Sequence, residues 1–251
     1  MDQTRAIQDR FGAAAAAYAA SEVHRGGPDL DAMLAAGVRS GRERVLDVGC
    51  GAGHTALAFA VRTAEVVAYD LTPAMLEQAR ALAAERGLAN LAFEQGHAAR
   101  LPFPDASFDV VTSRLAAHHF DDPASMVREA ARVLRPGGLL LLSDTIADEK
   151  PALDSFVNAL EILRDASHVR NHRVSEWEAM FRDAGLEPSV LGRFPIALEF
   201  DAWIARIGTP PDAVTGLRAL FATAPDEARA HFAIGADHAF HLDSALLRGE
   251  R

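Results

Sequence analysis

Short apolar runs alternate with longer amphipathic segments along roughly the first 150 residues of the chain. This alternation predicts an α/β fold in which helices cover both faces of a doubly wound, Rossmann-like, mostly parallel sheet. Pro73 at a first helical position and the stop signal Pro136-Gly137-Gly138 support the division into elements. The strands are expected near residues 44–48, 65–70, 91–95, 108–113 and 138–144, and the helices near residues 53–62, 73–86 and 124–134.

The remainder of the chain follows a different pattern. Residues 148–183 read as mainly helical and rich in charge, which predicts a small helical cap inserted after the fifth strand. Residues 201–231 predict two or three further helices that extend the cap, and strand patterns return near residues 187–194 and 238–247. No linker or internal repeat divides the sequence, so residues 1–251 are expected to form one domain.

A glycine-rich turn follows the first predicted strand. Gly49, Gly51 and Gly53 stand at alternate positions after Asp47, and glycine lets a backbone approach a ligand where a Cβ atom would clash. The second predicted strand ends at Asp70, near the spacing at which an acid accepts hydrogen bonds from a ribose. We therefore expect a nucleoside-containing cofactor at the carboxyl ends of the strands. The dinucleotide fingerprint G-x-G-x-x-G does not fit this turn.

The turn instead resembles the first motif of class I S-adenosylmethionine (SAM) methyltransferases. Together with four later segments, it makes the chain similar to the ubiquinone/menaquinone C-methyltransferase-like branch (Methyltransferase type 11). The resemblance covers roughly residues 5–190 and implies an antiparallel pair that completes a seven-stranded sheet, and a helical lid over residues 1–40. The five motifs, in order, are residues 47–53, 70–76, 96–103, 108–114 and 132–138.

The resemblance also implies roles for the cofactor-binding residues. Asp47 would fix the amino-acid end of SAM, although it could equally cap the glycine turn, and Cys50 would be inert packing inside that turn. Asp70 would accept both ribose hydroxyls. In the lid, Tyr18 and His24 would touch the methionine end, unless this segment is simply a helix packed on the sheet.

The adenine side departs from the commoner family pattern. His97 stands where many relatives carry an acid or threonine, and it could accept a hydrogen bond from the adenine amino group only as the neutral tautomer. The backbone amide of Ala98 could still donate to the ring. Leu71 and Met75 could pack on the adenine, and for Met75 a place in the helix core fits as well.

Candidate catalytic residues follow the fourth strand. Arg114 and the pair His118-His119 leave that strand where donor and acceptor should meet, because ligands lie outside the carboxyl ends of such sheets. One histidine could act as a general base, since an ordinary pKa near 6.5 suits that task. It could equally close the cofactor pocket through a hydrogen bond. We expect no metal, because adjacent histidines do not share a face and no carboxylate pair completes a set.

The predicted cap carries a second candidate cluster. A helix would bring Arg164 and His168 onto one face, and Arg164 or Arg170 facing the cleft would suit an anionic acceptor. The alternative is a solvated, salt-bridged face in which Asp165 pairs with Arg164 or its neighbours. The sequence leaves both readings open.

Composition narrows the class of protein. The net charge of −10 argues against binding of nucleic acid. The single cysteine excludes an intrachain disulfide and suggests a reducing compartment. No apolar run approaches the roughly 20 residues that span a bilayer. A soluble cytoplasmic protein is expected, and the oligomeric state is not indicated.

The predicted function is transfer of a methyl group from SAM to a small-molecule acceptor, at O, N or C, with S-adenosylhomocysteine (SAH) as the product. A quinone-like ring is favoured by analogy only. A SAM- or SAH-binding protein with other chemistry stays open. An NAD-dependent oxidoreductase is disfavoured by the glycine spacing. A nucleic-acid methyltransferase is disfavoured by the acidity and by Ser113-Arg114-Leu115-Ala116, which replaces the expected Asn/Asp-Pro-Pro-aromatic tetrad.

Overall fold

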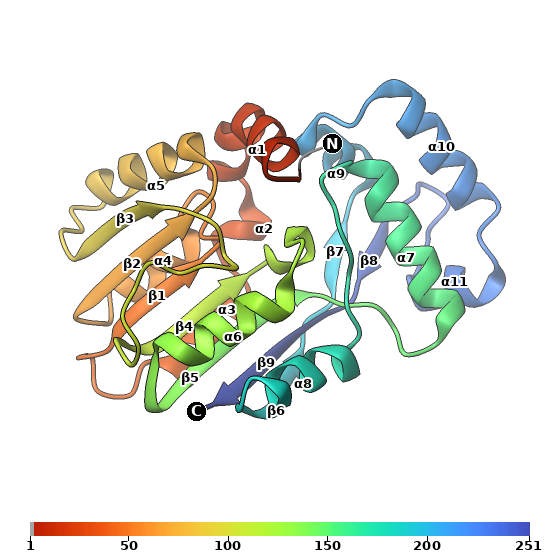
Figure 1. Cartoon of the computed structure of the whole chain (residues 1–251). Coiled ribbons are helices and arrows are strands. Elements are labelled where there is room, and N and C mark those ends of the chain that lie inside the picture. The colour runs from red at the N-terminus through yellow and green to blue at the C-terminus, as the bar shows by residue number, and fades with distance from the viewer. Residues whose placement is uncertain (1–2) are drawn as a thin grey trace.

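A seven-stranded sheet lies at the centre of the computed structural model, which describes residues 3–251 (Figure 1). The first five strands are parallel, and the last strand runs antiparallel between the fifth and sixth. This confirms the predicted fold class. In spatial order the strands are β3 (Leu91–Gln95), β2 (Glu65–Asp70), β1 (Arg44–Val48), β4 (Phe108–Arg114), β5 (Leu134–Thr145), β9 (Ser244–Glu250) and β6 (Glu187–Arg193).

Helices cover both faces of the sheet because successive strand residues point to opposite sides. Val45 packs in one core cluster with Met33 and Phe59, whereas Leu46 packs in the opposite cluster with Met126 and Trp177. The first face is covered by α3 (Pro28–Gly37), α4 (His54–Ala60) and part of α5 (Pro73–Glu85), and the second by α6 (Pro123–Val133) and α8 (Val174–Asp183).

The cap has a core of its own beside the sheet (Figure 1). Phe156, Trp203 and Phe221 are among its buried residues. It consists of α7 (Pro151–Arg164), α9 (Phe200–Ile207), α10 (Pro211–Ala222), α11 (Asp226–His231) and a two-stranded sheet of β7 (Ile196–Leu198) and β8 (Phe240–Leu242).

Two predicted boundaries in the second half of the chain differ from the structure. Only the first half of residues 148–183 joins the cap, because Trp177 and Phe181 of α8 pack in the core under the sheet. The strand pattern at residues 238–247 divides between β8 of the cap and β9 of the main sheet. Periodicity shows that a segment has an apolar face, but it does not show which partner that face will meet.

The N-terminal segment crosses the carboxyl edge of the parallel strands. Helix α1 (Gln3–Ala19) contacts both α5 and α9, and the short α2 (Glu22–Arg25) follows it (Figure 1). Helix α3 packs on the sheet instead, so the part that lies over the site ends before residue 28 rather than at residue 40. No helix within residues 3–251 is long and apolar enough to cross a membrane.

Candidate active site

A cavity opens at the carboxyl ends of β1, β2 and β4, beneath the N-terminal segment. It encloses about 950 Å³ including its open mouth. Its walls come from α1 and α2, the glycine turn, the segment after β2 and the segment after β4. Among the predicted site residues, those that line it are Tyr18, His24, Gly49, Cys50, Gly51, Asp70, Leu71, Met75, His97, Ala98, Arg114 and His119.

The three glycines of the turn have different surroundings. All have positive φ angles, of +69° at Gly49, +51° at Gly51 and +87° at Gly53, which other residues rarely adopt. A Cβ atom at Gly49 would lie 2.8 Å from that of Ala116, and one at Gly53 would lie 2.8 Å from that of Ala79. A Cβ atom at Gly51 would meet no protein atom within 4 Å. Gly51 therefore keeps open a part of the cavity that a side chain would fill.

Asp70 is buried at the end of β2, with both carboxylate oxygens held by the backbone. The amide of Gly51 donates to Oδ2 at 2.8 Å, and the amide of Thr72 donates to Oδ1 at 2.8 Å. Burial raises the pKa of Asp70 above its ordinary value, and the hydrogen bonds from Thr72 and Gly51 oppose the rise. Each oxygen keeps a further lone pair, so this carboxylate can accept from two neighbouring hydroxyls.

Asp47 lies behind the cavity wall, whereas Cys50 is a buried part of that wall. Asp47 does not line the cavity, and its Oδ1 accepts a hydrogen bond from Thr112 Oγ1 at 2.7 Å. Its Oδ2 is enclosed and has no hydrogen-bond partner within residues 3–251. Burial raises the pKa of Asp47 to about 7, although the Thr112 hydroxyl opposes this. Burial also raises the pKa of the Cys50 thiol well above its ordinary value, which disfavours the reactive thiolate.

The acceptor nitrogen expected of His97 is engaged by the protein itself. Nδ1 accepts a hydrogen bond from the Ala99 amide at 3.2 Å, so Nε2 carries the proton in the neutral ring. Nε2 lies 3.5 Å from Asp121 Oδ1, and Asp121 also lines the cavity. A carboxylate, which the sequence lacks at position 97, therefore lies beside the His97 ring on Asp121. Nearby, Met75 packs against Ala52, as expected of a helix-core residue, and also lines the cavity; its contact with the adenine stays a prediction.

The lid residues meet the glycine turn through His54, which sequence reasoning missed. His54 is the first residue of α4, lines the cavity, and its Nε2 lies 3.2 Å from the carbonyl oxygen of Tyr18. The Tyr18 ring lies 4.8 Å from that of His24, whose Nδ1 is 2.8 Å from Ser21 Oγ. Burial lowers the pKa of His24 well below its ordinary value, so its imidazole is neutral.

Arg114 connects the end of β4 to this lid. Its Nε donates to Asp29 Oδ2 at 2.5 Å and its Nη2 to Asp29 Oδ1 at 3.0 Å, which is the bidentate geometry of a strong ion pair. Nη1 donates to the His24 carbonyl at 2.8 Å, and Nη2 also donates to the Gly26 carbonyl at 3.0 Å. Every nitrogen of the guanidinium is engaged. Arg114 therefore holds the turn that carries His24, and Asp29 is a partner that the sequence did not reveal.

His118 and His119 occupy a short 3-10 turn, η1 (Ala117–His119), and differ in environment. His118 Nδ1 lies 2.6 Å from Oδ1 of Asp144 in β5. Burial alone would lower the pKa of His118, but Asp144 outweighs it and raises that pKa. His119 Nδ1 lies 3.1 Å from the Ser167 carbonyl, and burial together with neighbouring His118 lowers its pKa to about 3. Only His119 lines the cavity.

Arg164 and His168 do not share a helix face, contrary to the expectation from sequence. Helix α7 ends at Arg164, and Asp165 ends it by accepting hydrogen bonds from the amide and hydroxyl of Ser167 at 2.9 and 2.7 Å. The Arg164 guanidinium lies over the Trp203 ring, 5.0 Å from its centroid, and donates to the Trp203 carbonyl at 3.1 Å. His168 lies in the following loop.

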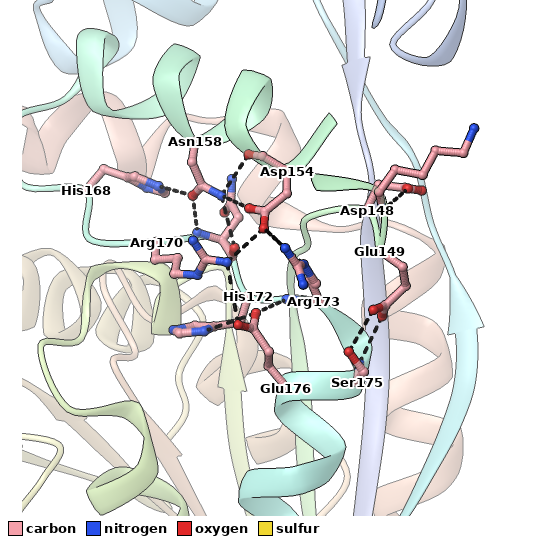
Figure 2. A network of polar contacts seen from close by, with 12 residues as sticks. Asp148, Glu149, Asp154, Asn158, His168, Arg170, His172, Arg173, Ser175 and Glu176 are labelled. Carbon is pink, nitrogen blue, oxygen red and sulfur yellow. Dashed lines mark hydrogen bonds and ion pairs between the residues drawn. The ribbon is translucent and has the colours of Figure 1, made fainter. Parts of the chain in front are cut away.

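Arg170 belongs to an ion-pair network at the base of the cap (Figure 2). Its Nη2 lies 2.9 Å from Asp154 Oδ2 and 3.5 Å from Glu176 Oε1, and Arg173 also reaches Asp154. Figure 2 shows both guanidinium groups directed at Asp154, while His168 points to Asn158, with Nε2 3.3 Å from its Oδ1. Arg170 is thus salt-bridged, but to Asp154 and Glu176 rather than to Asp165, which lies 3.5 Å from Arg10 Nε. None of Arg164, His168 and Arg170 lines the cavity.

The comparisons with known proteins agree with this geometry. The family described as "Methyltransferase domain" matches residues 46–142. The chain is 44% identical over 237 residues to the uncharacterized methyltransferase YcgJ of Bacillus subtilis, covering 92% of this chain and 94% of the relative. It is 38% identical over 199 residues to the uncharacterized protein YafE of Escherichia coli, covering 79% of this chain and 96% of YafE.

Solved structures give the same result. The crystal structure of B. subtilis YcgJ has a TM-score of 0.86 and 43% identity, covering 89% of this chain and 97% of that one. A putative methyltransferase from Bacillus halodurans has a TM-score of 0.84 and 38% identity, covering 89% and 99%. The chain therefore belongs to the SAM-dependent methyltransferase family. It is a SAM-dependent methyltransferase, and SAM is its cofactor.

The residues of the cavity fit SAM. The open direction at Gly51 leaves room for a ligand against the backbone, and Asp70 offers paired acceptors at a strand end. The enclosed, unpartnered Oδ2 of Asp47 lies at the end of β1, beneath the same turn. Within residues 3–251, no three histidine, cysteine or acidic side chains are grouped so as to hold a metal ion.

Proposed function

We propose that this methyltransferase transfers the methyl group to a small molecule bound in the same cavity as SAM. The observation that carries the proposal is the continuity of that cavity. Its lining runs from Asp70 and Gly51 on the cofactor side to Phe11 and His119 on the side of the lid and cap. A site enclosed in this way suits a small acceptor better than a nucleic acid, and the net charge of −10 supports the same choice.

On the cofactor side, Asp70 would accept both ribose hydroxyls while the amides of Gly51 and Thr72 hold its carboxylate in place. Asp47 would act at the amino-acid end through its unpartnered Oδ2. Gly49, Cys50 and Gly53 shape the turn, and Gly51 admits the ligand. Tyr18 and His24 would cover the methionine end.

On the adenine side, Leu71, Met75 and the Ala98 amide would contact the ring. Asp121 would accept from the adenine amino group, since the acceptor nitrogen of His97 is already engaged by Ala99. This reassignment keeps the predicted adenine site and changes only the residue that accepts the hydrogen bond from the adenine amino group.

When bound, SAM supplies a methyl group on a positively charged sulfur. The protein then has to orient the acceptor and exclude water. Arg114 serves this purpose by fixing the lid turn over the cavity. His118 serves it from the other side, because its carbonyl accepts hydrogen bonds from the amides of Val169 and Arg170 and so ties the cap loop to η1. His118 thus closes the pocket, while His119 faces into it.

Labelled methyl transfer tests the proposal. The purified protein is incubated with methyl-labelled SAM and a bacterial extract separated into small molecules, protein and nucleic acid. Label in a small molecule supports the proposed acceptor class, and mass spectrometry of that product identifies it. Label confined to protein or nucleic acid would overturn the proposal. Mass spectrometry of small molecules that co-purify with the folded protein offers a second route to the acceptor.

A further inference from the structure

The ring of His119 is fixed in one tautomer by the cap loop. Its Nδ1 lies 3.1 Å from the carbonyl oxygen of Ser167. A carbonyl can only accept, so Nδ1 carries the hydrogen and Nε2 of the neutral ring carries a lone pair. Nε2 makes no hydrogen bond within residues 3–251, and His119 lines the cavity. The Phe11 ring packs edge-on against the His119 imidazole, with 4.8 Å between the ring centroids, and further restricts rotation of the imidazole.

The groups that face His119 come from every element packed around it. His118 lies beside it in η1, Asp144 belongs to β5, and Asp165 and His168 belong to the cap loop. Burial and His118 lower the pKa of His119 to about 3, and the two aspartates only partly oppose this. The ring is therefore neutral near pH 7, and it offers an acceptor rather than a positive charge.

The cavity wall offers no free positive side chain beside it. Arg114 is the sole lysine or arginine among the lining residues of the described chain, and all its nitrogens are engaged by Asp29 and lid carbonyls. Two carboxylates, Asp70 and Asp121, also line the cavity. A carboxylate or phosphate at the reacting end of an acceptor would find no partner here, whereas a hydrogen-bond donor would find Nε2 of His119.

We propose that His119 Nε2 accepts a hydrogen bond from an uncharged O–H or N–H group of the acceptor, and that this oxygen or nitrogen is the atom methylated. The inference rests on the proposed function and specifies its acceptor class: hydroxyl or un-ionised amine compounds, methylated at O or N rather than at C. The Ser167 carbonyl is the positioning group, because it sets the tautomer.

The step balances without a further reactant. A lone pair of the acceptor atom forms the bond to the methyl carbon, and the methyl–sulfur bond breaks with its electron pair left on sulfur. On an amine, the methylated nitrogen is an ammonium that keeps its proton until it exchanges with solvent, and Nε2 only orients the N–H. On a hydroxyl, the methylated oxygen is an oxonium whose proton is strongly acidic, so that proton passes to Nε2 and from there to solvent. A base with a low pKa suffices for this late transfer, since no proton must leave before the methyl group moves.

Two variants of matched geometry test the role of each ring nitrogen. His119→Asn keeps a donor near the position of Nδ1 for the Ser167 carbonyl but removes the acceptor at Nε2. His119→Gln places an amide near the position of Nε2. We expect His119→Asn to lower the methylation rate of the acceptor found by labelling by about 100-fold or more, and His119→Gln to lower it less. Both variants should bind SAM within about threefold of wild type. Equal rates in wild type and His119→Asn would overturn the proposal.

A second measurement does not depend on turnover. Nitrogen-15 NMR of the wild-type protein, with the His119 signal identified by its loss in His119→Gln, reports which nitrogen is protonated. We expect Nδ1–H with a bare Nε2, unchanged between pH 7 and 5. A proton on Nε2, or a charged ring at pH 7, would overturn the inference.

The product settles the acceptor class. A methoxy or N-methyl product supports the proposal, and a C-methyl, methyl-ester or S-methyl product overturns it. If no labelled small molecule forms, the NMR result decides the inference alone. If calorimetry showed that the wild-type protein does not bind SAM, the proposed function itself would be wrong. Normal SAM binding together with the opposite tautomer of His119 would refute only this inference.

Discussion

The cofactor wall and the cap use charged residues in opposite ways. On the cofactor wall, Asp70 is held by two backbone amides and keeps lone pairs for a ligand, and Asp47 keeps one oxygen without a partner. In the cap, Asp154 receives Arg170 and Arg173, so the charges there neutralise one another. Acidic and basic residues look equally available in the sequence, but Asp70 and Asp47 keep acceptor positions free, whereas Asp154, Arg170 and Arg173 engage one another.

The difference arises from how each wall is built. The glycine turn and the end of β2 are local structures, and their polar atoms are oriented by the backbone of the same motif. The cap loop is held by side chains from α7 and α8 and from the loop itself, so its cations meet anions that lie elsewhere in the chain (Figure 2). Local motifs therefore predict well which polar atoms the backbone orients, whereas a cluster of charges in the sequence predicts mainly that the cluster will be paired.

The first prediction has the largest expected effect and concerns the open position in the glycine turn of the cofactor wall. Gly51→Val should abolish measurable SAM binding, because the branched side chain would occupy the open direction at the turn. Gly87→Val is the matched control, since Gly87 also has a positive φ of +66° and no protein atom near its Cβ position, but lies outside the cavity. Both variants carry backbone strain of about 1–2 kcal/mol, so they should lose similar stability.

Isothermal calorimetry and denaturant unfolding check this prediction together. Gly87→Val should bind SAM within about threefold of wild type. Normal SAM binding by a folded Gly51→Val protein would show that residues 49–53 do not form the cofactor turn.

The second prediction concerns the ribose. Asp70→Ala should weaken binding of SAM and SAH by about 2–4 kcal/mol, because two charge-assisted hydrogen bonds are lost. Asp70→Asn should lose less, since its amide oxygen still accepts one bond. Calorimetry measures both affinities, and thermal unfolding shows how much of the loss comes from releasing the amides of Gly51 and Thr72. Unchanged affinity in a folded Asp70→Ala protein would remove Asp70 from the site.

Much of the fold could be predicted because the strand signals are local. The expected strands at 44–48, 65–70 and 91–95 match β1, β2 and β3, and the antiparallel closing pair is confirmed in β9 and β6. The assignments of α3 to the lid and of α8 to the cap were wrong, because an amphipathic pattern does not name its partner. The local sequence determines which face of a helix or strand is apolar. It does not determine which part of the protein that face packs against.

The candidate site divides in the same way. Asp70 and Gly51 could be assigned from spacing, although their roles stay predictions. Asp29, Asp121 and Asp144 were missed, since each acts through a residue far away in sequence, such as Arg114 at 85 positions from Asp29. Asp144 did carry a signal, because a buried polar residue ends the apolar run of β5. His54 directly follows the glycine turn and could have been considered with it.

The third prediction uses the histidines between the two walls. His119 and His168 have pKa values lowered to about 3 and about 2 by burial first and by neighbouring histidines second. The unfolded chain therefore binds protons below about pH 6.5 that the folded chain does not, and stability falls as pH drops. His118 has the opposite sign, since its raised pKa stabilises the fold at low pH and that contribution disappears as pH rises.

Between pH 7 and 5, His119 and His168 should each contribute a loss of stability of up to about 2 kcal/mol. His24 acts with the same sign, and His118 and Asp47 act against it. His168→Gln keeps an amide for Asn158 and removes one titrating group, so its stability should fall less over this range by up to the same amount. Urea unfolding at the two pH values measures the difference. Identical pH dependence in wild type and variant would contradict the burial of a neutral His168.

The last prediction has the smallest expected effect and concerns the ion pairs of the cap. Arg170 is about one-third exposed and shares Asp154 with Arg173. Removal of either guanidinium leaves Asp154 with the other, so Arg170→Ala and Arg173→Ala should each cost less than about 1 kcal/mol of stability. Methylation of the acceptor found by labelling should stay within about threefold in both variants. If Arg170→Ala alone lowered turnover more than tenfold at unchanged SAM affinity, Arg170 would have to leave Asp154 to meet the acceptor, and the cap would contribute a charge to the site after all.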